Sequence, residues 1–309
     1  LHLLSRRQRQ MCIRDRKRND AFFAKLSSEG YGITYITDER IPLEDQDVDP
    51  AYFEGVICNS LFLYTPIERF SSLRFIQLTS AGFDRVPMDY VRAHHIKIHN
   101  ASGIYSIPLA ECAVFGVLQF YKQSRFFAEN QRRHQWEKCR DLLELYGKRV
   151  CVIGCGEVGT ECARRFHAFG CEVVGINRTI REDFNFERMT PLSQIDGELS
   201  EADVVILSIA LTKDTYHLLD AQRLALMKSG AVLVNIARGG VVDTDALIMT
   251  LPRLRGAALD VFEEEPLNEA SPLWDMENVI ITPHNAFLGE QNTDRIQKLI
   301  IRTLRMYMR

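Results

Sequence analysis

Residues 150–175, VCVIGCGEVGTECARRFHAFGCEVVG, constrain the fold more than any other stretch of this chain. A short β-branched run leads into the glycine-rich turn GCGEVG, a segment long enough for a helix follows, and Gly170 separates it from a second apolar run. This order of strand, glycine turn, helix and strand is typical of the first βαβ unit of a dinucleotide-binding sheet.

Each glycine of the turn has a predicted task. Gly154 allows the tight turn, Gly156 lets the backbone approach a pyrophosphate, and Gly159 lets the helix and strand pack closely. The phosphates would lie on the free N–H groups of the helix start, where the helix dipole is positive. A purely structural glycine turn is the alternative, but the surrounding strand–helix–strand pattern favours nucleotide binding.

Composition limits the remaining possibilities. A length of 309 residues with 46% hydrophobic content suits about two domains. The 38 basic and 41 acidic residues give a formal charge of −3, which argues against nucleic-acid binding. No apolar run approaches the roughly 20 residues of a membrane span. The eight cysteines form no CxxC pair, so we expect buried thiols in a reducing cytoplasm, and no metal site.

Residues 1–16, LHLLSRRQRQMCIRDR, differ from the rest of the chain because they are arginine-rich and have no sustained period. They resemble translated sequencing-adapter sequence, so we interpret them as a non-native segment that replaces a first strand. We therefore expect few long-range contacts from them, except for a makeshift strand at 1–4. A substrate domain left incomplete in this way is one alternative that the sequence leaves open.

The remaining chain alternates between apolar runs and helical segments, as in α/β folds with parallel sheets. The first part predicts strands at 32–36, 55–58, 75–79 and 96–100, with helices at 20–29, 66–70 and 88–93. A long helix is expected from Pro108 to about residue 131. The second part predicts strands at 150–153, 171–176, 203–208, 231–236, 257–260 and 279–282, and a final helix at 291–308.

Polar residues follow three of these strands, at the sheet edge where open α/β sheets bind ligands. Arg238 stands before two glycines, the acidic run 263–265 follows Asp260, and His284 follows Pro283. An arginine can bind a carboxylate through its fork, a histidine can exchange a proton, and a paired acid favours the charged imidazole. Each feature alone is commonly a solvated or structural group, but together they indicate a hydride-transfer site.

The motifs GCGEVG, VNIARGGVVD, GAALDVFEEEPL and TPHNAF, preceded by SIPLAE, resemble the D-isomer-specific 2-hydroxyacid dehydrogenases. The resemblance extends from about Tyr31 to the C-terminus. It implies reversible hydride transfer between a nicotinamide cofactor and a small 2-oxo acid, which gives the D-2-hydroxy acid. Since some relatives act as corepressors, a non-enzymatic NAD(P)-sensing protein is the alternative.

The resemblance assigns roles by motif position. Arg238 matches the carboxylate-binding arginine, and His284 matches the acid/base histidine. Glu265, the fifth residue after Asp260, matches the acid paired with that histidine, which makes Glu263 and Glu264 bystanders. The substrate carboxylate would also contact the backbone of Ser80, Ala81 and Gly82.

The same matches give a set of cofactor-binding residues, in which Asp260 would hold the nicotinamide carboxamide and Ser106 would lie near the cofactor. The set is Ser106, Gly154, Gly156, Glu157, Val158, Gly159, Asn177, Arg178, Thr179, Ile209, Ile236, Ala237 and Asp260. NAD-preferring members carry an aspartate where this chain has Asn177, followed by Arg178. The missing acid and the adjacent arginine favour NADP over NAD, with a solvated loop arginine as the alternative.

The family's architecture implies a Rossmann-type doubly wound parallel sheet inserted into a smaller flavodoxin-like α/β substrate domain. The substrate domain would comprise residues 17–100 and 286–309, and the dinucleotide-binding domain residues 101–285. Hinges are expected near 100–107 and 285–290, with closure of the cleft during turnover. The helix and arm of residues 108–136 resemble the family's homodimer contact; an ordinary interdomain helix is the alternative.

Overall fold

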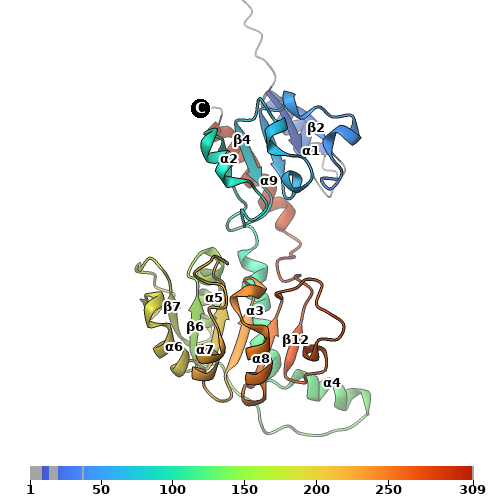
Figure 1. The fold of residues 1–309 in the computed structure, drawn as a ribbon. Coiled ribbons are helices and arrows are strands. Elements are labelled where there is room, and N and C mark those ends of the chain that lie inside the picture. Colours follow the sequence, from blue (N-terminus) through green and yellow to red (C-terminus); the bar gives the residue numbers. More distant parts are fainter. Residues whose placement is uncertain (1–8, 14–19, 37, 308–309) are drawn as a thin grey trace, which may run out of the picture. The chain divides into compact units, whose positions relative to one another are not determined.

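The apolar runs of the sequence form two parallel sheets, each in its own part of the chain (Figure 1). The computed structural model describes residues 9–13, 20–36 and 38–307. The terminal unit combines the chain up to Ile104 with the chain from Glu290 onward, and the central unit is Tyr105–Gly289. The chain therefore passes between the units at 104–105 and 289–290. Parallel sheets with helices confirm the predicted α/β class.

The central unit is built on a seven-stranded sheet in the order β12-β11-β10-β9-β6-β7-β8. Its strands are β6 (Arg149–Ile153), β7 (Glu172–Ile176), β8 (Arg188–Thr190), β9 (Val204–Leu207), β10 (Val232–Asn235), β11 (Gly256–Leu259) and β12 (Val279–Ile281). Its helices are α3 (Ser106–Tyr121), α4 (Ser124–Arg132), α5 (Glu157–Ala168), α6 (Ile195–Glu201), α7 (Ala221–Leu226) and α8 (Thr244–Thr250).

Both faces of this sheet are buried, because successive side chains of a strand point to opposite faces. In β6, Cys151 and Ile153 belong to one apolar cluster, together with residues of α6, α7 and α8. Val150 and Val152 belong to a second cluster, together with residues of α3 and α5. Helices therefore cover both faces, as the doubly wound prediction requires.

The strand order places a topological switch point between β6 and β9. From β6 the chain continues to β7 and β8 on one side, and β9 to β12 lie on the other side. In open α/β sheets the crevice outside the carboxyl ends of two such strands binds the ligand. The glycine turn follows β6, so it lies at this crevice.

The long helix expected from Pro108 onward is two helices. Gln123 separates α3 from α4 and has a positive φ of 52°, a left-handed conformation that ends the α-helical run. The sequence carries no proline or glycine at this point, so local propensity gave no signal of the break.

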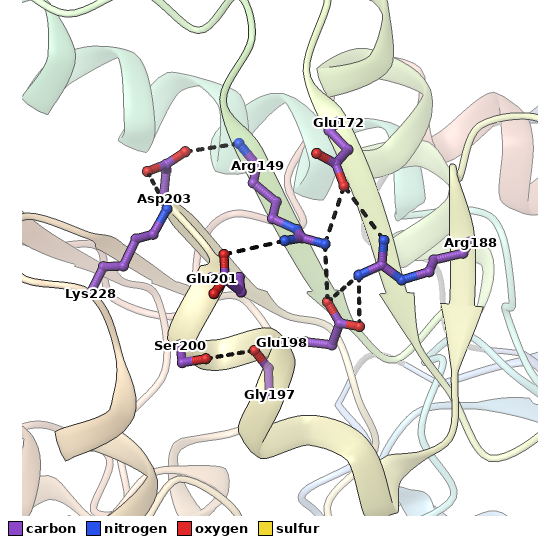
Figure 2. A network of polar contacts seen from close by, with 9 residues as sticks. All are labelled: Arg149, Glu172, Arg188, Gly197, Glu198, Ser200, Glu201, Asp203 and Lys228. Carbon is purple, nitrogen blue, oxygen red and sulfur yellow. Dashed lines mark hydrogen bonds and ion pairs between the residues drawn. The ribbon is translucent and has the colours of Figure 1, made fainter.

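A polar network joins the strand starts at the amino-terminal edge of the central sheet (Figure 2). Arg149 Nη2 lies 3.2 Å from Glu172 Oε1, and its Nη1 lies 3.5 Å from Glu201 Oε2. Arg188 Nη2 lies 2.9 Å from Glu198 Oε2. The network connects β6, β7, β8 and α6, at the edge opposite to the glycine turn. We assign it a role in the fold.

The terminal unit holds a five-stranded sheet in the order β2-β1-β3-β4-β5. Its strands are β1 (Arg9–Ile13), β2 (Tyr31–Tyr35), β3 (Gly55–Cys58), β4 (Phe75–Leu78) and β5 (Lys97–His99), and its helices are α1 (Asp20–Ser28), α2 (Met88–Ala93) and α9 (Asn292–Tyr307). The helix expected at 66–70 is a single 3₁₀ turn, Ile67–Arg69. Helix α9 packs Ile300 and Leu304 against Phe75, so both ends of the unit share one core.

The expectation that residues 1–16 make few long-range contacts is wrong for residues 9–13. They form β1, which pairs in parallel with β2 and with β3. The physical reason lies in the topology. Strand β1 lies between β2 and β3, and the connection from β1 through α1 to the parallel strand β2 is an ordinary βαβ crossover. The remaining residues of that segment lie outside the described part of the chain. Throughout the described residues, every helix is too short or too polar to cross a membrane.

Candidate active site

The glycine turn has the geometry that its sequence predicts. Gly154 has a φ of +96°, and a Cβ there would lie 2.6 Å from the Ile209 backbone. A Cβ on Gly159 would lie 2.1 Å from the Gly154 carbonyl oxygen, so only glycine allows this approach of helix and strand. Ile209 follows β9, so the loops after β6 and β9 touch at the switch point.

The start of α5 is open to a ligand. A Cβ built on Gly156 meets nothing within 4 Å, and Gly156 caps α5 without a side-chain hydrogen bond. Glu157 and Val158 are the first residues of this helix. Uncapped N–H groups at the positive end of a helix are suited to phosphate.

The loop after β7 carries the three residues predicted to contact the adenosine end of the cofactor. Asn177 Nδ2 donates to the carbonyl oxygen of Thr179 at 2.9 Å, and Arg178 and Thr179 are exposed. Arg181 was not predicted to belong to the site. Its Nη2 donates to the Cys155 carbonyl oxygen at 3.0 Å and to Thr160 Oγ1 at 2.9 Å. Arg181 thereby links this loop to the glycine turn.

The loop after β10 carries Arg238. Asn235 is 1% exposed, and its side chain accepts from Ala237 N at 3.1 Å and donates to the Arg238 carbonyl oxygen at 3.2 Å. Ile236 and Ala237 are buried beside it. A Cβ on Gly239 would lie 1.8 Å from the Phe262 carbonyl carbon, so this loop presses directly on the loop after β11.

Asp260, at the end of β11, holds the turn that carries His284. Its Oδ1 accepts from Thr282 Oγ1 at 2.5 Å and from Asn285 N at 2.8 Å, and its Oδ2 accepts from Ala286 N at 3.1 Å. Its backbone oxygen accepts from His284 N at 2.7 Å. Asp260 is 3% exposed, and these bonds compensate the burial of its charge. Its predicted role at the carboxamide remains a proposal.

His284 and Glu265 meet although they lie 19 positions apart. His284 Nδ1 is 2.8 Å from Glu265 Oε2, and Glu265 Oε1 accepts from Phe262 N at 3.1 Å. Because Nδ1 faces the carboxylate, Nε2 is the nitrogen left to reach a ligand. Both side chains are partly open, at 39% and 38% exposed. This is the arrangement of an acid/base histidine with an orienting acid.

Glu263 has hydrogen-bond partners of its own, apart from the His284–Glu265 pair. Its Oε1 lies 2.6 Å from His217 Nε2, and its Oε2 accepts from Thr244 N at 2.9 Å. Partial burial works to raise the pKa of Glu263, but the hydrogen bonds from Thr244 and His217 together lower it below the usual value. His217 gave no signal in the sequence, because its partner lies 46 positions away. Glu264 is exposed.

Ser80, Ala81 and Gly82 follow β4 in the terminal unit, at the carboxyl edge of that sheet. Asn100 Nδ2 donates to the Ala81 carbonyl oxygen at 2.6 Å, and Ser80 Oγ donates to the Gly82 carbonyl oxygen at 3.1 Å. These bonds use the oxygens of the loop. An anion would require its N–H groups instead.

The residues present fit a dinucleotide on two independent grounds. The glycine turn leaves an open, uncapped helix start. Ser106, at the first turn of α3, is 3% exposed, and its Oγ has no hydrogen-bond partner among the described residues. A buried hydroxyl without a partner is costly unless a ligand or water completes it.

Comparison with known proteins agrees with this geometry. The family model described as the NAD binding domain of D-isomer specific 2-hydroxyacid dehydrogenases matches residues 114–286. The glyoxylate reductase of Korarchaeum cryptofilum is 31% identical over 245 residues, which cover 77% of this chain and 74% of that protein. The glyoxylate reductase of Pyrococcus horikoshii is 33% identical over 232 residues, which cover 70% of this chain and 68% of that protein.

Solved structures give the same result. A glyoxylate reductase from Paecilomyes thermophila superposes with a TM-score of 0.82 at 25% identity, covering 96% of this chain and 94% of that one. A D-isomer specific 2-hydroxyacid dehydrogenase from Xanthobacter autotrophicus, in complex with NADPH and MES, has a TM-score of 0.75 at 27% identity, covering 94% and 92%.

The chain belongs to the D-isomer-specific 2-hydroxyacid dehydrogenase family. It is an NAD(P)-dependent oxidoreductase of the 2-oxo acid and 2-hydroxy acid pair. The resemblance on which the sequence analysis relied is thereby confirmed.

Proposed function

We propose that this protein reduces a small 2-oxo acid, with glyoxylate and hydroxypyruvate as the first candidates, and that NADPH is its preferred cofactor. The observation that carries the proposal is the 2.8 Å pair of His284 and Glu265, adjacent to the loop of Arg238. The relatives from Korarchaeum cryptofilum and Pyrococcus horikoshii are glyoxylate reductases.

The roles of the side chains follow from their chemistry. The cofactor, when bound, supplies the hydride. Arg238 binds the substrate carboxylate through its fork, and the backbone N–H groups of Ser80, Ala81 and Gly82 bind the same carboxylate. His284 Nε2 donates a proton to the carbonyl oxygen, and Glu265 stabilises the charged imidazole before that transfer.

A substrate screen tests this function. Purified protein is mixed with NADPH or NADH and with glyoxylate, hydroxypyruvate, pyruvate or a branched 2-oxo acid, and nicotinamide absorbance is followed. We expect turnover of at least one small 2-oxo acid, and D-glycerate as the product from hydroxypyruvate. Absence of turnover with all of them, while the protein binds the cofactor, would favour a binding protein instead.

The cofactor preference rests on the loop after β7. Asn177 carries no charge to repel a 2′-phosphate, and Arg178 is exposed at the end of the same strand. A charge-assisted pair of this kind contributes about 1.5–3 kcal/mol, or about 10- to 150-fold in affinity. Arg178→Ala should therefore weaken NADPH far more than NADH, and less so at high salt. Equal Michaelis constants for both cofactors in the unmodified protein would contradict the preference.

We also propose a homodimer formed through the central unit. A pocket of about 730 Å³ is lined by Phe127, Asn130, Gln131 and residues 134–140. Trp136 is fully exposed there, and the buried side-chain Nδ2 of Asn130 has no hydrogen-bond partner among the described residues. Exposed aromatic groups of this kind are typical of interfaces. The mass from sedimentation equilibrium should be twice the 35.5 kDa of one chain. Trp136→Asp should lower this mass towards that of one chain. A monomer would contradict the proposal.

The free thiols of the described part suit a cytoplasmic location.

A further inference from the structure

A second histidine–glutamate pair lies next to the candidate active site. His217 and Glu263 are 2.6 Å apart, and Glu263 also accepts the Thr244 N–H at the start of α8. A second carboxylate near this imidazole is that of Asp243, whose Oδ2 is 3.9 Å from His217 Nδ1. The Tyr216 ring stacks on His217 at 4.0 Å. Neither His217 nor Glu263 has a role in the proton transfer described above.

The pair connects the loops that carry the catalytic groups. His217 N donates to the Gly240 carbonyl oxygen at 2.8 Å, two residues after Arg238. Glu263 lies two residues before Glu265, whose position is held by the Phe262 N–H. Its side chain therefore joins three segments: the loop after β9, the start of α8 and the loop after β11.

We propose that His217 and Glu263 are positioning residues, which fix the loop of Glu265 against the loop of Arg238 so that His284 and the carboxylate-binding arginine keep their separation. This inference rests on the proposed reduction of a 2-oxo acid. The pair acts through Glu265 and Arg238 and has no contact with substrate of its own.

The geometry explains why a hydrogen bond is needed here in addition to packing. Gly239 presses on the backbone of Phe262, which prevents the two loops from approaching further but does not prevent them from separating. The bonds of Glu263 with His217 and with the Thr244 N–H supply the opposing restraint. Misplacement of reacting groups by about 1 Å costs on the order of 100-fold in rate, so a looser loop lowers turnover without changing the fold.

Two substitutions of His217 separate positioning from stability. Residue 217 has a positive φ of 49°, a conformation that asparagine tolerates well. His217→Asn therefore keeps the backbone, but its short amide cannot reach Glu263. His217→Gln places an amide nitrogen near the position of Nε2 and can restore the hydrogen bond. Glu263→Asp is a third variant, with a carboxylate too short to bridge both partners.

The experiment measures kcat, the Michaelis constant of the 2-oxo acid, the cofactor dissociation constant and the thermal midpoint for each variant. For His217→Asn we expect kcat to fall about tenfold and the Michaelis constant to rise, with unchanged cofactor binding and only a small fall in the thermal midpoint. His217→Gln should recover most of the loss. Hydrogen exchange of the Thr244 amide should be faster in Glu263→Asp than in the unmodified protein.

Two results would overturn the inference. One is unmodified kinetics in His217→Asn. The other is a loss of activity that follows the thermal midpoint in every variant, including His217→Gln. Both are distinct from failure of the proposed function, in which the unmodified protein itself turns over no 2-oxo acid.

Discussion

Replacement of Gly239 by alanine should separate the two catalytic loops. An added Cβ would lie 1.8 Å from the carbonyl carbon of Phe262 and 2.0 Å from its oxygen. Ordinary contact begins at 3.4 Å, so the loop of Arg238 and the loop of Glu265 must move apart by about 1.6 Å. The opposing atoms are backbone, and no side-chain rotation can relieve the overlap.

The size of the effect follows from this displacement. A movement above 1 Å between groups that bind and protonate the substrate should lower kcat/KM by about 100-fold or more. Overpacking of this kind also costs about 1–3 kcal/mol. In a unit of this size each kcal/mol lowers the thermal midpoint by about 2–4 °C, so the variant should still be folded at 25 °C.

Gly240→Ala is the matched control. Its Cβ would lie 3.4 Å from the side chains of Leu211 and Tyr216, which is ordinary contact. Both variants are assayed for turnover of a 2-oxo acid, cofactor binding and thermal midpoint. The control should stay within a few-fold of the unmodified protein. If Gly239→Ala kept its activity, or if both variants lost it equally, the argument for a close contact between the loops would be wrong.

Two further predictions concern the cofactor site and acid stability. Gly156→Ala should leave the thermal midpoint unchanged, because the added Cβ meets no atom within 4 Å. It should raise the dissociation constant of NADPH at least about tenfold, because the Cβ occupies space that the pyrophosphate needs. Unchanged affinity in a fluorescence titration would contradict this expectation. Glu263→Gln should destabilise the protein at neutral pH. Since hydrogen bonds from Thr244 and His217 outweigh burial and lower the pKa of Glu263 from 4.5, its contribution is present above that value and lost as the pH falls through the lowered pKa. The free energy of unfolding in urea should therefore be lower for Glu263→Gln than for the unmodified protein, and this difference should shrink in acid. A difference that does not change with pH would contradict the prediction.

Local sequence signals predicted the elements of the central unit that carry the site. The β-branched runs and the glycine turn specify β6, α5 and β7 through strand propensity and backbone requirements, which are properties of neighbouring residues. The pairing of His284 with Glu265 came from motif positions of the family, and the structure brings the two side chains together.

Features that depend on distant partners were not predicted. The bond between Glu263 and His217 was not predicted, because His217 lies 46 positions away on another loop and the acidic run itself does not distinguish its three members. Arg181 was missed because its contacts with Cys155 and Thr160 form only when the loop after β7 folds over the glycine turn. Strand β1 was excluded on composition, whereas backbone pairing with β2 and β3 requires no particular side chains.

The most direct test of the proposed proton transfer is the turnover of His284→Ala with NADPH and the best 2-oxo acid of the screen, measured together with NADPH binding. We expect kcat to fall roughly 100-fold or more, because the proton donor is lost, while the dissociation constant of NADPH stays unchanged. Turnover equal to that of the unmodified protein would contradict it, since another group would then supply the proton.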